Sequence, residues 1–442
     1  MNRNQRARLS NSGESYSEKI ERILKRGTSV VAFLLPLKLS LAYIALSPLI
    51  VLWAWSNRLT LLRGSIPERT RGIAAPLILF LSLCVLSAAV GIAPWRSFRA
   101  LSSLIFFALT IPLFASKAEV KPVCFALVVG QSIAALHSFF EAAFSGVVPR
   151  VFLGKVTESG QLAITIPLAL GMIYSARRPD SSRADDFRAI AFAIVFTLLL
   201  TANGFSPDLG LPKTLILPLV AALIVAVAFL ATQLKRIHSA TRETLLTLTL
   251  AMPLMICALL VNLKRGPWLG TIIGAGCFAC FYSRKLIAPL AIAAISAAIL
   301  ITPIRDRILD SYEHFTIAGG RSTIWRIGAE LISEYPLGIG YHNSGILREF
   351  SPEIPPELKH FHNNLLNIAA ETGWLGVSVF IWLIIAIVKT CFKDRDKPLY
   401  VALGCAVISW QCAGLVEYNF GDSEVTIMIW ILLGLIVKGE AE

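Results

Sequence analysis

Long apolar runs recur along this chain from residue 28 to residue 437, and they constrain the fold more than any other feature. A bilayer core about 30 Å thick is crossed by about 20 apolar residues in an α-helix. The composition agrees, because 55% of the 442 residues are hydrophobic and only 16% are charged. A soluble domain has more charge and less apolar surface. The chain is therefore predicted to be an all-α polytopic integral membrane protein.

The positions of the runs predict about fourteen spans, or about twelve if the hairpin 188–234 does not cross the membrane. The spans before residue 303 are predicted at 28–39, 40–55, 73–93, 98–115, 121–141, 158–176, 188–203, 213–234, 243–263, 266–282 and 286–302. Three more are predicted at 364–388, 398–416 and 423–437. The hydrophilic segment 303–362 lies between the two groups, and polar chemistry is expected there.

Lys and Arg residues are concentrated in alternate loops, as they are when basic loops stay in the cytoplasm. The pattern holds if residues 28–55 form two half-length spans, whereas one long helix would break it. The opposite short loops then contain only Arg96, Arg99, Arg150, Lys155, Lys213, Lys264 and Arg265. Both termini are therefore predicted to be cytoplasmic, with segment 303–362 facing outward. The net charge of +13 reflects this topology and contact with anionic membrane lipids, and it indicates no nucleic-acid partner.

Four parts are predicted along the chain. Residues 1–27 form a basic cytoplasmic tail, which is expected to be retained because no small-residue cleavage site follows the first apolar run. Residues 28–302 form an N-terminal transmembrane bundle, 303–362 the outward loop and 363–438 the C-terminal transmembrane helices.

The stretch "GGRSTIWRIGAELISEYPLGIG" in the outward loop predicts a short amphipathic helix. Gly319 and Gly320 break the chain before it, Ser322 is a candidate cap, and Pro336 ends it. Its buried stripe is predicted at Ile324, Ile327, Leu331 and Ile332.

Arg321 is predicted at the first turn of that helix, where a cation is unfavourable unless an anion lies close. The simpler explanation is a solvated arginine, or one paired with Glu330 or Glu334. Trp325 is expected to pack the helix rather than contact a sugar.

Arg265 lies in "VNLKRGPWLG", in a very short outward turn between two predicted spans. Lys and Arg near helix ends commonly reach for lipid headgroups, which is one explanation of Lys264 and Arg265. The other is that Gly266 and Pro267 fix the guanidinium at the membrane surface, where it and Arg321 form a clamp for a phosphate.

His362 directly precedes the predicted helix that begins at "NNLLN". Asn363 is a favourable residue at a helix start, and the positive end of the helix dipole disfavours a protonated histidine beside it. A neutral His362 is able to accept a proton as a general base. A capping or interfacial role is the simpler alternative. A zinc site of His342, His360 and His362 is disfavoured, because no thiolate or carboxylate cluster completes it.

The segment "HNNLLNIAAETGWLG", from His362 through Gly373 to Gly376, resembles the signature of bacterial O-antigen ligases. The preceding loop, with its Arg, Trp and Pro-x-Gly-x-Gly run, and the "LKRGPW" element are also similar to that family. Lys264 stands where the family usually has Ser. The resemblance covers about residues 265 to 380.

This resemblance implies a GT-C-like membrane glycosyltransferase of the bacterial (Gram-negative) inner membrane, with its active site facing the periplasm. Its donor would be a glycan on undecaprenyl diphosphate, and its acceptor lipid A-core. The transfer would be inverting and metal-independent, and no cofactor is expected. His362 would activate the acceptor hydroxyl, and Arg265 and Arg321 would hold the donor diphosphate. His360, Asn363 and Lys264 would support them. Apart from the resemblance, Glu417 and Asp422 in the last outward loop are candidate contacts for the acceptor, and a solvated turn explains them equally well.

Three alternatives remain open at this point. An O-antigen polymerase or a protein O-oligosaccharyltransferase would use the same lipid carrier. A transporter or flippase would instead line a pathway with Lys38, Arg265 and Glu417, although intramembrane charges are few here.

Overall fold

A computed structural model describes residues 16–63, 68–145, 154–176 and 239–439, apart from 283, 285–286, 318, 351–353 and 355–357, together with residues 197 and 201. The described chain is helical and contains no strand. The predicted spans in these ranges lie largely in helix, but the one predicted at 28–39 belongs to a helix that already begins at Tyr16 and ends at Leu34. The hairpin 188–234 lies outside the described residues.

The N-terminal helices are α2 (Tyr16–Leu34), α3 (Leu39–Arg63), α4 (Glu68–Val90), α5 (Pro94–Ala108), α6 (Thr110–Lys117), α7 (Val120–Ser145) and α8 (Lys155–Ala176). The chain then continues through α11 (Ser239–Val261), α12 (Arg265–Tyr282) and α13 (Ile287–Leu300). The C-terminal helices are α18 (Asn364–Lys393), α19 (Pro398–Ala413) and α20 (Ser423–Lys438).

Six helical stretches in the described ranges are long and apolar enough to cross a membrane. They are Leu39–Asn57, Arg71–Val90, Pro94–Lys117, Val120–Ala142, Lys155–Ala176 and Asn364–Lys393. Shorter apolar helices lie at Thr247–Val261 and Pro398–Ala413. The chain is thus an all-α polytopic membrane protein, as predicted. The two helices predicted within 28–55 are also separate, since the chain turns between Leu34 and Leu39 and Gly27 of α2 packs on Leu49 of α3.

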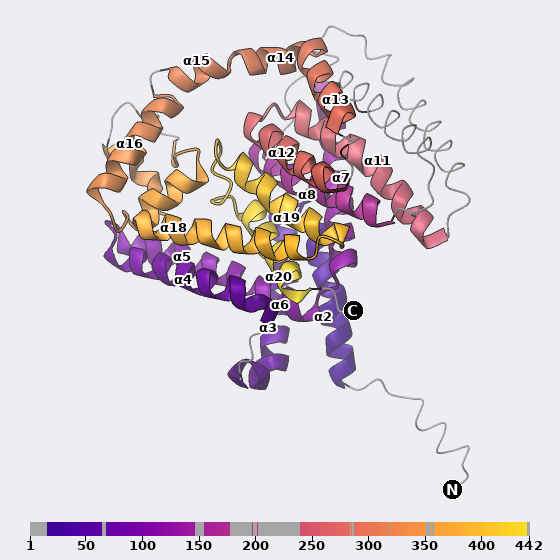
Figure 1. Ribbon diagram of the computed structural model, residues 1–442. Helices are drawn as coiled ribbons and strands as arrows, with labels where there is room; N and C mark the ends of the chain where they lie inside the picture. Colours follow the sequence, from indigo (N-terminus) through magenta and orange to yellow (C-terminus); the bar gives the residue numbers. More distant parts are fainter. Residues whose placement is uncertain are drawn as a thin grey trace, which may run out of the picture.

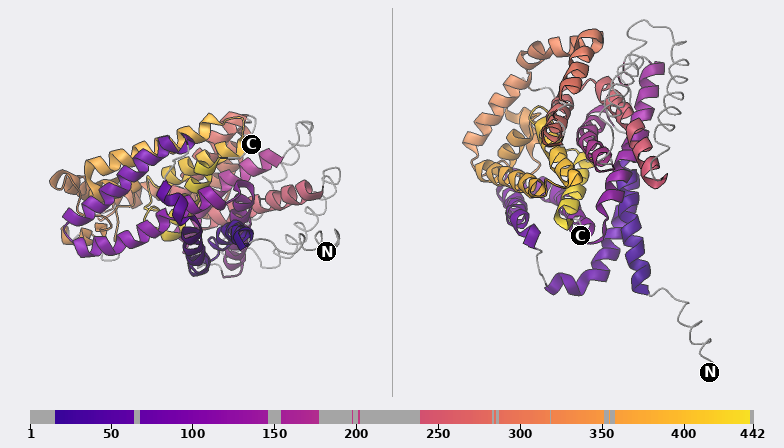
Figure 2. Two further views of the ribbon diagram at one scale, coloured as in Figure 1. Left: turned by 90° about the horizontal axis from the view of Figure 1, so that it is seen from below. Right: turned by 45° about the vertical axis from the view of Figure 1, so that its right-hand side comes forward.

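The outward loop is mostly helical. It contains α14 (Thr302–Leu309), α15 (Ser311–Thr316), α16 (Arg321–Glu334), the 3-10 turn η4 (Ser344–Ile346) and α17 (Leu347–Phe350). Figure 1 shows α14, α15 and α16 as an orange arc that leads from α13 back toward the start of α18. Figures 1 and 2 show α18 lying along α4, with which it packs.

Small residues let α12 approach α19 closely. Gly266, Gly270 and Gly274 recur every four residues and so lie on one face of α12. A side chain at Gly270 would meet the Ser409 carbonyl, and one at Gly266 would lie 2.9 Å from the Glu417 side chain. This packing holds the N-terminal end of α12, and with it Arg265, beside the loop between α19 and α20.

Candidate active site

Glu417 is the centre of the polar site, which lies at the helix ends that are predicted to face outward. It lies in the loop after α19, and only 8% of its surface is exposed. Its Oε1 accepts from Arg321 Nη2 at 3.0 Å, and its Oε2 lies 3.2 Å from His362 Nδ1. One carboxylate therefore joins two residues that are 41 positions apart in the sequence and that the sequence analysis had singled out independently.

The pKa of Glu417 lies below its ordinary value. Burial acts to raise this pKa, but the hydrogen bond from His362 and the charges of Arg321, His362 and Lys264 lower it by more. The carboxylate is therefore ionised at neutral pH. Because a carboxylate only accepts, His362 Nδ1 carries a proton, and Nε2 is the nitrogen that has a lone pair in the neutral imidazole.

Four cations gather around this one carboxylate. Arg321 contacts it, and Lys264 and Arg265 lie near enough to Arg321 and Glu417 for their charges to interact. Arg307 of α14 is the fourth, since its charge acts on both Lys264 and Arg265. Burial lowers the pKa of Lys264, the charge of Glu417 opposes this, and the charges of Arg307, Arg321 and Arg265 lower the pKa further. These cations outnumber the carboxylate, so the cluster keeps a surplus of positive charge, which suits a multiply charged anion.

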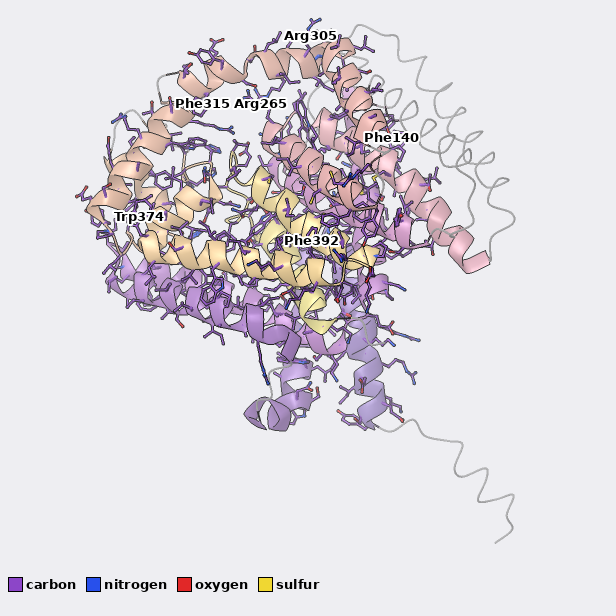
Figure 3. All side chains as sticks on the ribbon, viewed as in Figure 1. Phe140, Arg265, Arg305, Phe315, Trp374 and Phe392 are labelled. Atoms are coloured by element: carbon purple, nitrogen blue, oxygen red, sulfur yellow. The ribbon has the colours of Figure 1, made fainter. Side chains whose placement is uncertain are left out.

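The turn that presents Lys264 and Arg265 is fixed from several sides. Leu263 has the left-handed φ of 54°, and its carbonyl accepts from Arg307 Nε at 3.2 Å. Asn262, just before it, donates to the buried carboxylate of Glu158 at 2.7 Å. Figure 3 places Arg265 beneath the arc of α14 to α16. The surrounding fold therefore holds the turn that carries Arg265 in place. A side chain that only reaches for lipid headgroups would not require such support.

His362 also has a left-handed backbone, with φ of 50°. Asn363 is the N-cap of α18, as predicted: its Oδ1 accepts from the Leu366 amide at 3.0 Å and its Nδ2 donates to the Leu415 carbonyl at 2.9 Å. Trp325 packs the loop helix, as expected, and donates from Nε1 to the Phe361 carbonyl at 3.0 Å. The histidine is thus held from both sides by its chain neighbours.

His360 packs edge-on against His362, with ring centroids 4.3 Å apart. Burial, followed by the charges of His362 and Arg321, lowers the pKa of His360 to about 4. In the described part of the chain no three His, Cys, Asp or Glu side chains are grouped to hold a metal ion, so His342, His360 and His362 do not form such a site.

Helix α16 spans Arg321–Glu334, and the predicted stripe is buried. Two expectations about it were wrong. Gly320, not Ser322, occupies the N-cap position, and no side chain caps the helix there. Arg321 pairs with Glu417 rather than with Glu330 or Glu334, and Glu330 pairs instead with the exposed Arg326. The anion that a cation at a helix start requires comes from a distant loop.

Gly373 breaks α18, with φ of 74°. The break frees backbone groups that pair with the Pro-x-Gly-x-Gly run: Ile339 donates to the Ala370 carbonyl at 2.8 Å, and Trp374 donates to the Pro336 carbonyl at 3.3 Å. A side chain at Gly373 would collide with that carbonyl. Gly373 therefore seats the outward loop on α18.

The sequence did not identify Arg307 or Glu371, which lies within the signature segment, as site residues. It also did not show that Glu417 pairs with Arg321 and His362. Glu371 is buried, and its Oε1 accepts from Asn367 at 2.9 Å and from the Ser344 amide at 3.3 Å. A carboxylate inside a predicted apolar span was the available signal for Glu371. Arg307 had no such signal, because it lies on a helix rich in charge.

Part of the chain that carries these residues is similar to known proteins. Residues 250–381 match a family model described as O-antigen ligase. A Rickettsia conorii protein named "putative polysaccharide ligase" is 26% identical over 302 residues, which is 62% of this chain and 72% of the relative. Proteins of the same name in Rickettsia felis and Rickettsia typhi are 26% and 29% identical, over 42% and 27% of this chain and 50% and 33% of the relatives.

The fold and these comparisons define a multi-pass membrane glycosyltransferase of the ligase or polymerase type. Within that class, residues 250–381 are similar to the O-antigen ligase family, which is the family that the motifs of the chain indicated. The family-model match ends before Glu417, whose contacts with Arg321 and His362 come from the structure.

Proposed function

We propose that this protein is an O-antigen ligase, which transfers a glycan from undecaprenyl diphosphate to lipid A-core at the periplasmic face of the inner membrane. The observation that carries the proposal is the meeting of His362, Glu417 and Arg321, with Lys264, Arg265 and Arg307 around them. A base and an anion site side by side are what transfer from a diphosphate carrier requires.

In this reaction His362 Nε2 takes the proton of an acceptor hydroxyl as its oxygen attacks the anomeric carbon of the donor sugar. The bond from that carbon to the diphosphate oxygen breaks, and the electron pair stays on the diphosphate. Attack from the face opposite the leaving group inverts the anomeric centre. Glu417 holds the imidazole by Nδ1 and stabilises the imidazolium that forms.

The cations have their largest effect late in this step. Breaking the glycosyl bond adds negative charge to the diphosphate, and donors already aimed at that position stabilise the transition state more than the ground state. Arg265 and Arg321 are the proposed direct ligands. Arg307 and Lys264 add charge, and Arg307 also holds the turn that carries Arg265.

The test is rescue of a gene deletion in the host, with gels that read lipopolysaccharide and carrier-linked glycan separately. Wild type is expected to restore long polymer to lipopolysaccharide. His362→Ala is expected to lose about 10²- to 10⁴-fold in rate, and Arg265→Ala or Arg321→Ala about 10²- to 10³-fold, with polymer accumulating on the carrier. Arg326→Ala, which removes an exposed cation on α16 outside the site, is the matched control and should rescue fully.

Other results would contradict the proposal in distinct ways. Lipopolysaccharide capped with single repeat units in the deletion would indicate a polymerase. Glycan missing from a protein rather than from lipopolysaccharide would indicate a protein O-oligosaccharyltransferase. Full rescue by His362→Ala would remove the histidine from the chemistry.

A further inference from the structure

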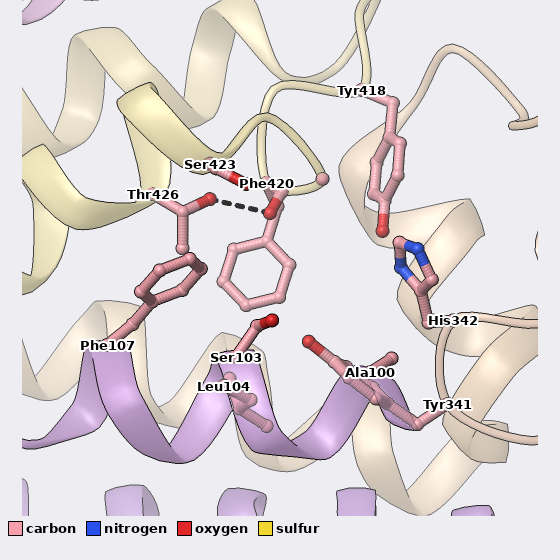
Figure 4. A pocket seen from close by; sticks show the side chains of 11 residues that line it. Ala100, Ser103, Leu104, Phe107, Tyr341, His342, Tyr418, Phe420, Ser423 and Thr426 are labelled. Atoms are coloured by element: carbon pink, nitrogen blue, oxygen red, sulfur yellow. Dashed lines mark hydrogen bonds between the residues drawn. The ribbon is translucent and has the colours of Figure 1, made fainter. Parts of the chain in front are cut away.

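A cavity of about 140 Å³ lies beside the site, between α5, the loop after α16 and the loop into α20. Its lining combines aromatic rings with hydroxyl groups, and Figure 4 shows them facing one another across the space. The side chains that matter most here are Ser103, Phe107, Tyr341, His342, Tyr418 and Phe420. No charged side chain lines this cavity, so it suits a neutral ligand.

The cavity is connected to the proposed base through a chain of ring contacts. Tyr418, which follows Glu417 in the chain, has its ring centroid 5.3 Å from that of His360. The His360 ring is in turn 4.3 Å from that of His362. A ligand against Tyr418 is therefore separated from His362 by two side chains, those of Tyr418 and His360.

The backbone of His342 points to a role for the cavity. Among described residues other than glycine, only Leu263, His342 and His362 have a clearly left-handed φ. This conformation is uncommon for residues other than glycine. Where the surrounding structure enforces it, such residues are often found at functional sites. Leu263 precedes the cations of the proposed active site, and His362 is its proposed base. His342, with φ of 62°, is exposed at the cavity instead.

The size and the lining fit one sugar ring. Water occupies about 30 Å³ per molecule in the liquid, so the cavity replaces only a few waters and is too small for a lipid chain. A pyranose presents C–H groups on its faces, which pack on aromatic rings, and hydroxyls at its rim. Ser103, Tyr341 and Tyr418 supply hydroxyl partners for such a rim.

We propose that this cavity binds one neutral sugar ring of a glycan substrate, adjacent to the sugar that reacts. The inference rests on the proposed glycosyl transfer. The ring belongs either to the acceptor core or to the donor glycan, and these two sources are separated by experiment.

The decisive variant is Ser103→Leu, which fills the cavity from α5. Ser102→Leu is the matched control, because Ser102 is exposed on the same helix and does not line the cavity. In detergent-solubilised full-length protein, KM is measured for the core acceptor and for the carrier-linked donor in turn. Ser103→Leu is expected to raise one of the two KM values about tenfold, as the loss of about 1.4 kcal/mol of binding produces, and Ser102→Leu neither. A changed acceptor KM assigns the ring to the acceptor, and a changed donor KM to the donor.

His342→Asn tests the same cavity if Ser103→Leu fails to fold, because Asn tolerates the left-handed backbone while the ring is lost. It should raise the same KM. If the cavity variants match Ser102→Leu in both KM values, the proposal is overturned.

Binding without chemistry separates this inference from the proposed function. Core oligosaccharide and O-polysaccharide, each released from lipopolysaccharide by mild acid, are added to wild type and to the cavity variants, and saturation-transfer NMR reads contact with the protein. Signal that Ser103→Leu removes and Ser102→Leu keeps supports the cavity even if the ligase reaction proves to be wrong. Signal that is equal in all variants contradicts the cavity even if the ligase reaction is correct.

Discussion

Glu417 contacts His362 and Arg321 at once, so its charge acts on the proposed base and on the anion site together. Glu417→Gln keeps the shape and loses the charge. We expect the rate of transfer to fall about 10- to 100-fold, which corresponds to losing one hydrogen bond between charged groups. The measurement is initial rate with purified donor and acceptor.

Glu330→Gln is the control for that variant, because the pair of Glu330 with Arg326 is exposed and contributes little. Equal rates for wild type and Glu417→Gln would show that the carboxylate does not influence the chemistry.

His360 makes stability depend on pH. In the folded protein its pKa is about 4, whereas an unfolded histidine has its ordinary value of 6.5. The unfolded state therefore binds more protons between these values, and stability falls as pH is lowered from 6.5 toward 4. Melting temperature in detergent, followed from pH 7 to pH 4.5, should fall less for His360→Gln than for wild type. Parallel curves would mean that His360 is protonated without cost in the fold.

At the scale of elements, the break in α18 joins two motifs that are separate in the sequence. The carbonyls freed at Gly373 accept from the Pro-x-Gly-x-Gly run, and the Ser87 hydroxyl of α4 also donates to the freed Glu371 carbonyl. The outward loop is thereby tied to α18 and α4. A glycine within a helical pattern can mark a break in the helix, but the sequence does not show which segment packs against that break.

Gly373→Ala is expected to destabilise the fold by at least about 1–3 kcal/mol, because alanine is strained at this φ and its Cβ would collide with Pro336. Gly276→Ala in α12 is the control, because nothing lies within 4 Å of the added Cβ, and it should be neutral or stabilising by up to about 1 kcal/mol. Thermal unfolding in detergent compares the two. Equal melting temperatures would mean that α18 straightens at little cost.

For the whole molecule, the distribution of basic residues predicts one topology. Alkaline phosphatase, which is active only outside the cytoplasm, is fused within 64–72, within 303–362 or after 438. Only the fusion in 303–362 should be active, since both other positions are predicted to be cytoplasmic. Activity of the fusion after residue 438 would reverse the sidedness and move the proposed site to the cytoplasm.

The sequence by itself determined the membrane class, the positions of the helices and the residues worth testing. Helix α16 with its buried stripe and the cap at Asn363 follow from periodicity and from preferences within a few residues. Such local patterns are read directly from the chain.

Only the tertiary structure decided which of these residues meet. Glu417 lies 55 residues from His362 and 96 from Arg321, and no local pattern relates them. Arg307 and the cavity at His342 likewise depend on how α14 and α5 pack. The reason is physical. A helix is specified by residues that are neighbours in the sequence. A site between helices is specified by contacts between distant segments, such as those of Gly266 with Glu417 and of Gly373 with Pro336.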